Sequence, residues 1–232
     1  MCDDTPYESR RVHLSRTFDE DAELYDRARP GYPPELFDDL AEVVGTGPGC
    51  RVLEVGAGTR KATLPLAERG CRITAVELGA GMAAVARRNL AGFGAVEVVT
   101  ADFEAWQHVA GGSEEFFVEV QDCYERFDPA TAPGLRLPVA KDVDTSDHAD
   151  EVAHSGRFSP VVFRRYEWDL MYTTSEYLEV LRTYSGHRAL PPEAREGLLG
   201  CIARLIDERY GGRVTKRYLT ELRVSRTVPL CR

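Results

Sequence analysis

The chain has 232 residues, of which 43% are hydrophobic and 29% charged, and its 38 acidic residues outnumber 29 Lys and Arg, giving a net charge of −9. This composition is typical of a globular domain, and the excess of acid disfavours a duplex nucleic-acid partner. The sequence has no stretch near the ~18 consecutive apolar residues that a membrane span needs, and its start has no apolar core that could serve as a secretion signal. We therefore expect a cytoplasmic protein that binds neither membrane nor nucleic acid.

The cysteines and histidines are scattered along the chain. No two of the six cysteines form a C-x-x-C pair, and none lies beside a histidine at the spacing of a metal site. In a cytosolic protein this pattern favours reduced, partly buried thiols and no metal site.

Two helices are predicted near the N-terminus. Apolar residues recur at helical spacing from Phe18 to Tyr25, and the Pro- and Gly-rich run at 29–34 interrupts that pattern. A second apolar helical face runs from Leu36 to Val44 and ends in a glycine-rich turn.

Strands and helices then alternate. Short apolar strands are predicted at 50–55, 71–77 and 96–100, separated by helices at 61–68 and 80–91. Alternation at these lengths implies right-handed crossovers and a parallel sheet.

Beyond Trp106 the alternation stops. The expected elements are a helix over 113–127, a long surface segment over 128–157, a strand from Val161, helices over 175–184 and 192–210, and a strand over 214–224. Thr174 or Ser175 is expected to cap the first of the two later helices. We expect the two late strands to form an antiparallel pair that closes the sheet.

The first predicted strand ends in a glycine turn. Glu54-x-Gly56-x-Gly58 follows the strand and precedes a helix, so that the backbone can approach a ligand near free N–H groups at the helix N-terminus. The alternative is a tight turn that binds nothing.

Two acids follow the next strands. Glu77 ends the second strand, where its carboxylate can accept both hydroxyls of a ribose. Asp102, followed by Phe103, comes just after the third strand and can receive an adenine amine while the ring stacks. Either acid alone is more often a solvated strand end, but together with the glycines they predict a binding site across three strand ends.

These residues resemble the class I S-adenosylmethionine-dependent methyltransferases. Residues 52–58 (VLEVGAG) look like the first motif of that family, 75–77 (AVE) like its ribose-binding motif and 101–103 (ADF) like its adenine-binding motif. Residues 25–33 (YDRARPGYP) are similar to the N-terminal lid of a bacterial small-molecule subgroup, and the tail from Tyr177 to Tyr218 resembles the same subgroup.

The resemblance implies a fold and a site. The fold is a Rossmann-like three-layer α/β sandwich, in which residues 1–34 form an arm and lid and 35–232 a single domain. The implied function is methyl transfer from S-adenosyl-L-methionine to a small molecule. The implied cofactor-binding residues are Glu54, Gly56, Ala57, Gly58, Glu77, Leu78, Asp102 and Phe103. The lid would place Tyr25, Arg29 and Tyr32 beside the substrate, where aromatic rings favour a sulfonium, although each tyrosine can equally be a packing residue. The sequence identifies no catalytic base.

Arg60 departs from the family pattern, which has a glycine there. A cation at a helix N-terminus opposes the helix dipole, and this side chain would lie near the methionine part of the cofactor. Arg60 either blocks that space, or points to solvent or pairs with an acid such as Glu54.

The chain is also short after Trp106. One strand–helix–strand unit takes roughly 30 residues, yet residues 107–112 lead directly to the next helix. The central fourth and fifth strands are therefore expected to be missing, either from the protein or from this sequence.

Two main hypotheses for the function remain. The protein is a small-molecule methyltransferase, or it is a relative that has lost cofactor competence and serves a binding role. A third, a nucleotide-dependent enzyme of another class, is weak because there is no G-K-[ST] loop and Lys61 breaks G-x-G-x-x-G.

Overall fold

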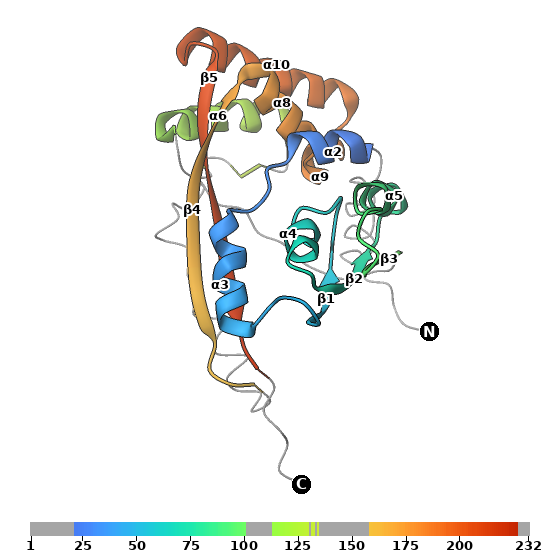
Figure 1. Ribbon diagram of the computed structural model, residues 1–232. Helices are drawn as coiled ribbons and strands as arrows, with labels where there is room; N and C mark the ends of the chain where they lie inside the picture. The colour runs from blue at the N-terminus through green and yellow to red at the C-terminus, as the bar shows by residue number, and fades with distance from the viewer. Residues whose placement is uncertain (1–20, 101–112, 130, 133, 135–157, 227–232) are drawn as a thin grey trace, which may run out of the picture.

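The structure is a computed structural model that describes residues 21–100, 113–129, 131, 132, 134 and 158–226 (Figure 1). Its elements, in chain order, are α2 (Ala22–Ala28), α3 (Pro34–Val44), β1 (Arg51–Val55), α4 (Thr63–Glu68), β2 (Arg72–Glu77), α5 (Ala80–Asn89), β3 (Val96–Thr100), α6 (Glu114–Phe127), β4 (Val162–Thr173), α8 (Thr174–Arg182), α9 (Ser185–Arg188), α10 (Pro192–Arg209) and β5 (Arg213–Val224). The predicted Asp102 and Phe103, and most of the expected surface segment at 128–157, lie outside the described residues.

The parallel sheet has the order β1-β2-β3. Strands β1 and β2 pair from Arg51 opposite Arg72 onward. Strands β2 and β3 pair up to their carboxyl ends, where Glu77 lies opposite Thr100. The middle strand is the most buried, with Ile73 and Ala75 at 1% and 0% exposure, because it has a neighbour on both sides. The described residues contain no further parallel strand, and Leu53 on the edge strand β1 is 68% exposed.

The late strands β4 and β5 form the expected antiparallel pair, in register over twelve residues each. Within the described residues this pair is a separate two-stranded sheet and does not hydrogen-bond to β1–β3, so it does not close the parallel sheet as the sequence suggested. Instead, the long ribbon runs beside α3, where the Tyr166 hydroxyl donates to Asp39 at 2.6 Å (Figure 1). The expected α/β class, with its parallel sheet and its antiparallel pair, is confirmed.

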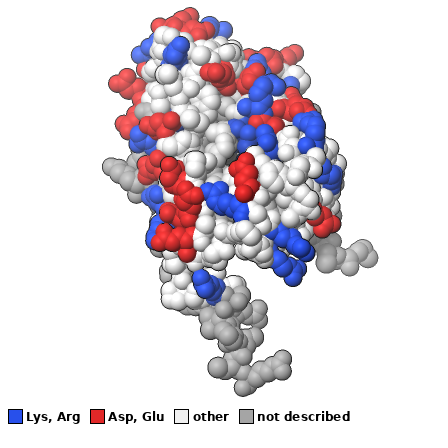
Figure 2. All heavy atoms as spheres, in the orientation of Figure 1, with Lys and Arg blue, Asp and Glu red and all other residues white. Residues whose placement is uncertain are grey.

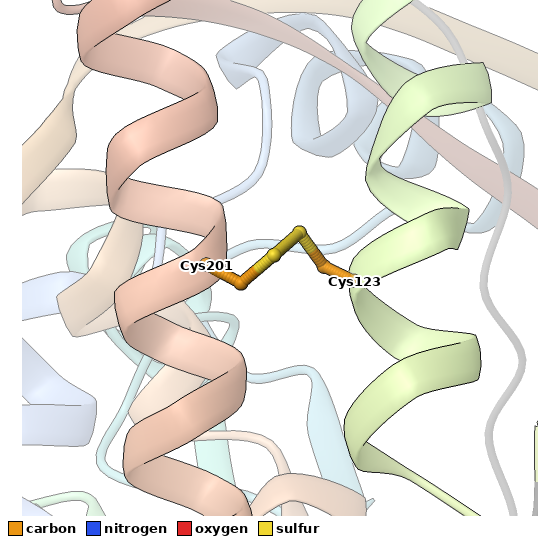
Figure 3. The surroundings of a disulfide bond; sticks show 2 residues. All are labelled: Cys123 and Cys201. Atoms are coloured by element: carbon orange, nitrogen blue, oxygen red, sulfur yellow. A yellow bond between two sulfur atoms is a disulfide. The ribbon is translucent and has the colours of Figure 1, made fainter.

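A second hydrophobic core is formed by α6, α8 and α10 together with the end of β4 and the beginning of β5. Phe116, Leu198, Ile202 and Ile206 are fully buried there. A disulfide between Cys123 on α6 and Cys201 on α10 crosses this core (Figure 3). The expectation of reduced thiols is therefore wrong for this pair, because folding brings together two cysteines that are 78 residues apart, while Cys50 and Cys71 are free.

Two helix starts differ from expectation. Thr173, rather than Thr174 or Ser175, caps α8, and it does so in a capping box with Glu176, whose side chain accepts from the Thr173 N–H. Helix α4 begins at Thr63 rather than Lys61, because Arg60 lies outside helical geometry with a φ of 128°.

Acidic and basic side chains are interspersed over the face drawn in Figure 2. No helix in the described part of the chain is long and apolar enough to cross a membrane.

Candidate functional site

The glycine turn after β1 is bonded to the end of β2. The N–H groups of Gly56 and Ala57 both donate to the carbonyl oxygen of Val76, at 2.8 and 3.1 Å. Gly56 and Gly58 have φ values of 71° and 60°, which residues with a Cβ rarely adopt. The two glycines of the sequence motif are therefore required by the turn itself.

Glu77 lies against this turn. Its Oε2 accepts from the Gly58 N–H at 2.7 Å, and its Oε1 accepts from the Gly79 N–H at 3.0 Å. The carboxylate thus joins the glycine turn to the turn that precedes α5, and each oxygen retains a lone pair for a ligand. The structure places Glu77 where the sequence predicted, and adds a structural role that the sequence did not reveal. The neighbouring Leu78 is half-buried.

Glu54 is a half-buried acid on β1, two residues before Gly56. Burial raises its pKa to about 7; the charge of Glu77 raises it further, whereas the nearby Thr63 hydroxyl lowers it. Its Oε2 is buried and has no hydrogen-bond partner among the described residues. A buried carboxylate oxygen without a partner costs free energy, so this side chain suits a ligand that brings a cationic donor.

Helix α2 covers the glycine turn. A Cβ placed on Gly58 would lie 3.8 Å from the Tyr25 ring and 3.7 Å from the end of Met82. Burial raises the pKa of Tyr25, and also that of Tyr32, whose ring packs edge-on against Phe37 with 6.3 Å between centroids. Of the three residues predicted for the lid, Tyr25 therefore contacts the glycine turn.

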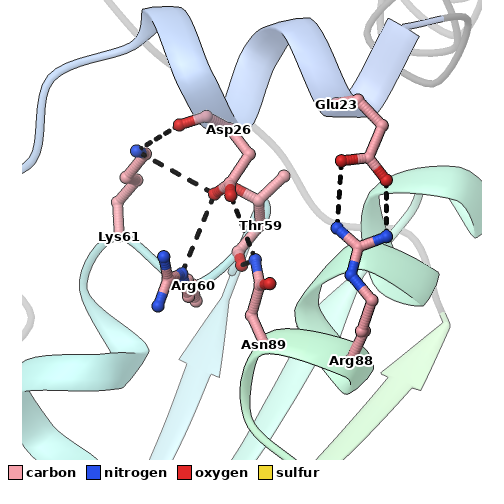
Figure 4. A network of polar contacts seen from close by, with 7 residues as sticks. All are labelled: Glu23, Asp26, Thr59, Arg60, Lys61, Arg88 and Asn89. Carbon is pink, nitrogen blue, oxygen red and sulfur yellow. Dashed lines mark hydrogen bonds and ion pairs between the residues drawn. The ribbon is translucent and has the colours of Figure 1, made fainter.

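Asp26 is the residue that fastens this helix, and it was missed in the sequence (Figure 4). Its backbone carbonyl accepts from Lys61 Nζ at 2.6 Å, and its carboxylate accepts from Asn89 at 3.1 Å and lies 3.9 Å from both Arg60 and Lys61. Burial lowers the pKa of Lys61, an effect that Asp26 opposes. No sequence pattern predicts this role, because an acid on a polar helix is ordinarily solvated.

Arg60 therefore pairs with Asp26 of α2, and Glu54 is not its partner. The arginine adopts a φ of 128°, and no other described residue besides glycine has a positive φ. Since a bulky L-residue is strained in this region, the backbone retains the geometry of a glycine at a position where the family pattern has one.

Arg29 follows helix α2 and contacts Thr183, Tyr25 and Tyr184. Its Nε donates to the Thr183 hydroxyl at 2.7 Å, and its guanidinium lies 5.2 Å from the ring centre of Tyr25 and 4.4 Å from that of Tyr184. Among the described residues, no group of three or more His, Cys, Asp or Glu side chains is arranged to hold a metal ion.

Residues 52–131 match the family model of the methyltransferase domain. This match, together with the relatives below, supports a class I S-adenosylmethionine-dependent methyltransferase family for the chain. Its matched region contains the glycine turn, Glu77, the strands of the parallel sheet and α6.

Curated relatives agree with this assignment. An uncharacterized methyltransferase of Mycobacterium bovis is 42% identical over 67 residues, which cover 29% of this chain and 26% of that protein. A protein-L-isoaspartate O-methyltransferase of Methylorubrum populi is 44% identical over 79 residues, 33% of this chain and 37% of that protein. The chain thus aligns with only about a quarter to a third of the length of these relatives. The solved structure of YjhP from E. coli covers 91% of this chain and all of its own length, at 14% identity and a TM-score of 0.43.

Proposed function

We propose that this protein binds S-adenosylmethionine at the carboxyl ends of β1 and β2 and transfers its methyl group to a small-molecule acceptor. The observation that carries the proposal is the group formed by the Gly56–Gly58 turn, the Glu77 carboxylate bonded to it, and the buried, unpartnered Oε2 of Glu54. All three lie within the strand–helix–strand unit formed by β1, α4 and β2, inside the region that matches the methyltransferase domain.

Each of these groups would contact a different part of S-adenosylmethionine. The remaining lone pairs of Glu77 would accept the ribose hydroxyls, and Leu78, next along the chain, would pack against the adenine. The turn at Gly56, Ala57 and Gly58 would let the methionine part lie close to the backbone. Glu54 would pair with the amino group of the cofactor, which supplies the cation that its buried oxygen lacks. Asp102 and Phe103 are proposed by resemblance alone.

The lid would complete the site. The cofactor supplies an electrophilic methyl group on a sulfonium, and the rings of Tyr25 and Tyr32 would favour that cation and exclude water. Tyr25 and Met82 lie within 4 Å of the space above Gly58, so a movement of α2 would widen access to the glycine turn. Displacement of this kind depends chiefly on positioning, so the absence of an identifiable base does not count against it.

The organisation and location of the chain are part of the same proposal. Residues 1–34 would be the arm and lid, and 35–232 one domain. A cytoplasmic location is proposed from composition, and the Cys123–Cys201 disulfide weighs against it, because disulfides are rare in reducing compartments. Counting free thiols in protein isolated from cytosol under non-reducing conditions tests this point.

A second candidate is a binding protein that has lost cofactor competence. Strained Arg60 at the cofactor-side turn and the 68% exposed Leu53 on the edge strand favour it, since both mark departures from a complete site and sheet.

Titration calorimetry with S-adenosylhomocysteine separates the two candidates. We expect binding by the unmodified chain, and a loss of about 1–3 kcal/mol in Glu77→Ala, the range for removing one partner of a buried hydrogen bond. Glu97→Ala is the matched control, because Glu97 is an exposed acid on the adjacent strand β3, and it should leave the affinity unchanged. No binding by a chain that unfolds cooperatively would overturn the proposal and favour the second candidate.

A further inference from the structure

Two cations share the ring of Tyr184. The guanidinium of Arg29 lies 4.4 Å from the ring centre and Nζ of Lys216 lies 5.0 Å from it. They come from distant parts of the chain, Arg29 from the end of α2 and Lys216 from β5, and Lys216 also donates to the Tyr184 hydroxyl. Both side chains are half-buried, so they are partly desolvated but still reachable.

The hydrogen-bond partners of both cations are neutral. Arg29 donates to the hydroxyl and carbonyl of Thr183, and no carboxylate in the described part of the chain forms an ion pair with Arg29 or Lys216. Two like charges beside one ring repel each other, and partial burial weakens the screening by water. An anion placed between them would relieve this repulsion.

His187 lies next to Tyr184 and is affected by the charges of both cations. Its ring lies 5.4 Å from that of Tyr184, and burial lowers its pKa, assisted by the charges of Lys216 and Arg29; a bond to the Leu181 carbonyl and the charge of Asp128 oppose the shift. The two cations therefore form a local positive pair in a chain of net charge −9.

The cluster adjoins the candidate cofactor site through Tyr25. Arg29 lies 5.2 Å from the ring centre of Tyr25, and the edge of that ring lies over Gly58. A group bound between Arg29 and Lys216 would therefore lie near Tyr25, whose ring edge contacts the glycine turn.

We propose that Arg29 and Lys216 bind a carboxylate of the methyl acceptor, and hence that the acceptor is a small carboxylic acid. This inference rests on the proposed function. A carboxylate accepts charge-assisted hydrogen bonds from both an arginine and a lysine, and the surrounding rings of Tyr25, Tyr184 and Tyr218 suit an aromatic acid.

Benzoate and benzamide test the charge requirement, because they match in size and differ in charge. Binding to the full chain is followed by the shifts of backbone amide NMR signals, and benzoate should bind at least about tenfold more tightly than benzamide. Lys216→Met should abolish this preference, and Lys216→Arg should retain it. Arg217→Met is the matched control, because it removes the same charge one residue along, on the opposite face of β5, where Arg217 pairs with Asp169. It should leave the preference unchanged.

S-adenosylhomocysteine distinguishes the two possible sources of the carboxylate. If Lys216→Met leaves the affinity for S-adenosylhomocysteine unchanged and benzoate binds together with it, the carboxylate belongs to the acceptor. An equal loss of affinity for both ligands would show that the cations hold the carboxylate of the cofactor, and would overturn this inference while leaving the proposed function standing. Equal or absent binding of benzoate and benzamide would also overturn it, whereas failure of S-adenosylhomocysteine to bind would count against the proposed function itself.

Discussion

Replacing Glu54 with glutamine should make the stability of this protein less dependent on pH. Burial raises the pKa of Glu54 from 4.5 to about 7, so the folded state holds the proton more tightly than the unfolded chain does. The stability that comes from this proton is fully present below the unfolded pKa and is lost as the pH rises through about 7. At about 1.4 kcal/mol per pKa unit, and allowing for the exposed part of the side chain, the loss is about 2–3 kcal/mol.

Glutamine resembles the protonated acid and cannot ionise. At about pH 5, where Glu54 is mostly protonated in the folded state, Glu54→Gln and the unmodified chain should have similar free energies of unfolding in urea; at about pH 8 the variant should be more stable by about 2–3 kcal/mol. Glu97→Gln, at an exposed position on β3, should give no such pH-dependent gain. A stability difference between Glu54→Gln and the unmodified chain that is the same at both pH values would refute the reasoning.

Three further perturbations follow from the geometry. Arg60→Gly should be more stable than Arg60→Ala by about 1–2 kcal/mol in urea unfolding, the reverse of the usual order, because only glycine tolerates a φ of 128° without strain; an alanine variant of equal or greater stability would contradict this. Asp26→Asn should increase amide hydrogen exchange in α2, since Asp26 contacts Arg60, Lys61 and Asn89, whereas Glu23→Gln, which breaks only an exposed pair with Arg88, should have little effect. An equal increase of amide hydrogen exchange in the two variants would show that Asp26 does not hold α2 in place. Reduction of the Cys123–Cys201 disulfide, or the substitution Cys123→Ser, should lower the free energy of unfolding by about 2–4 kcal/mol. A reductant should not change the stability of the serine variant. If a reductant also leaves the stability of the unmodified chain unchanged, the disulfide is not formed.

The sequence determined the features that depend on short stretches of chain. The strand–helix alternation through β1, β2 and β3 follows from apolar runs and their spacing, and the turn at Gly56 and Gly58 follows from the need for positive φ after a strand. Because parallel strands bring their carboxyl ends to one edge, the same local patterns placed Glu77 beside that turn.

Only the tertiary structure decided which distant side chains meet. Nothing local connects Asp26 with Arg60, Arg29 with Lys216, or Cys123 with Cys201, and each pair is brought together by the packing of helices and strands far apart in the sequence. The raised pKa of Glu54 likewise arises from burial, which is a property of the folded surroundings and not of the residues beside it. Local periodicity fixes which face of an element is apolar, but the partner of that face, and therefore the electrostatics of the site, are set by long-range packing.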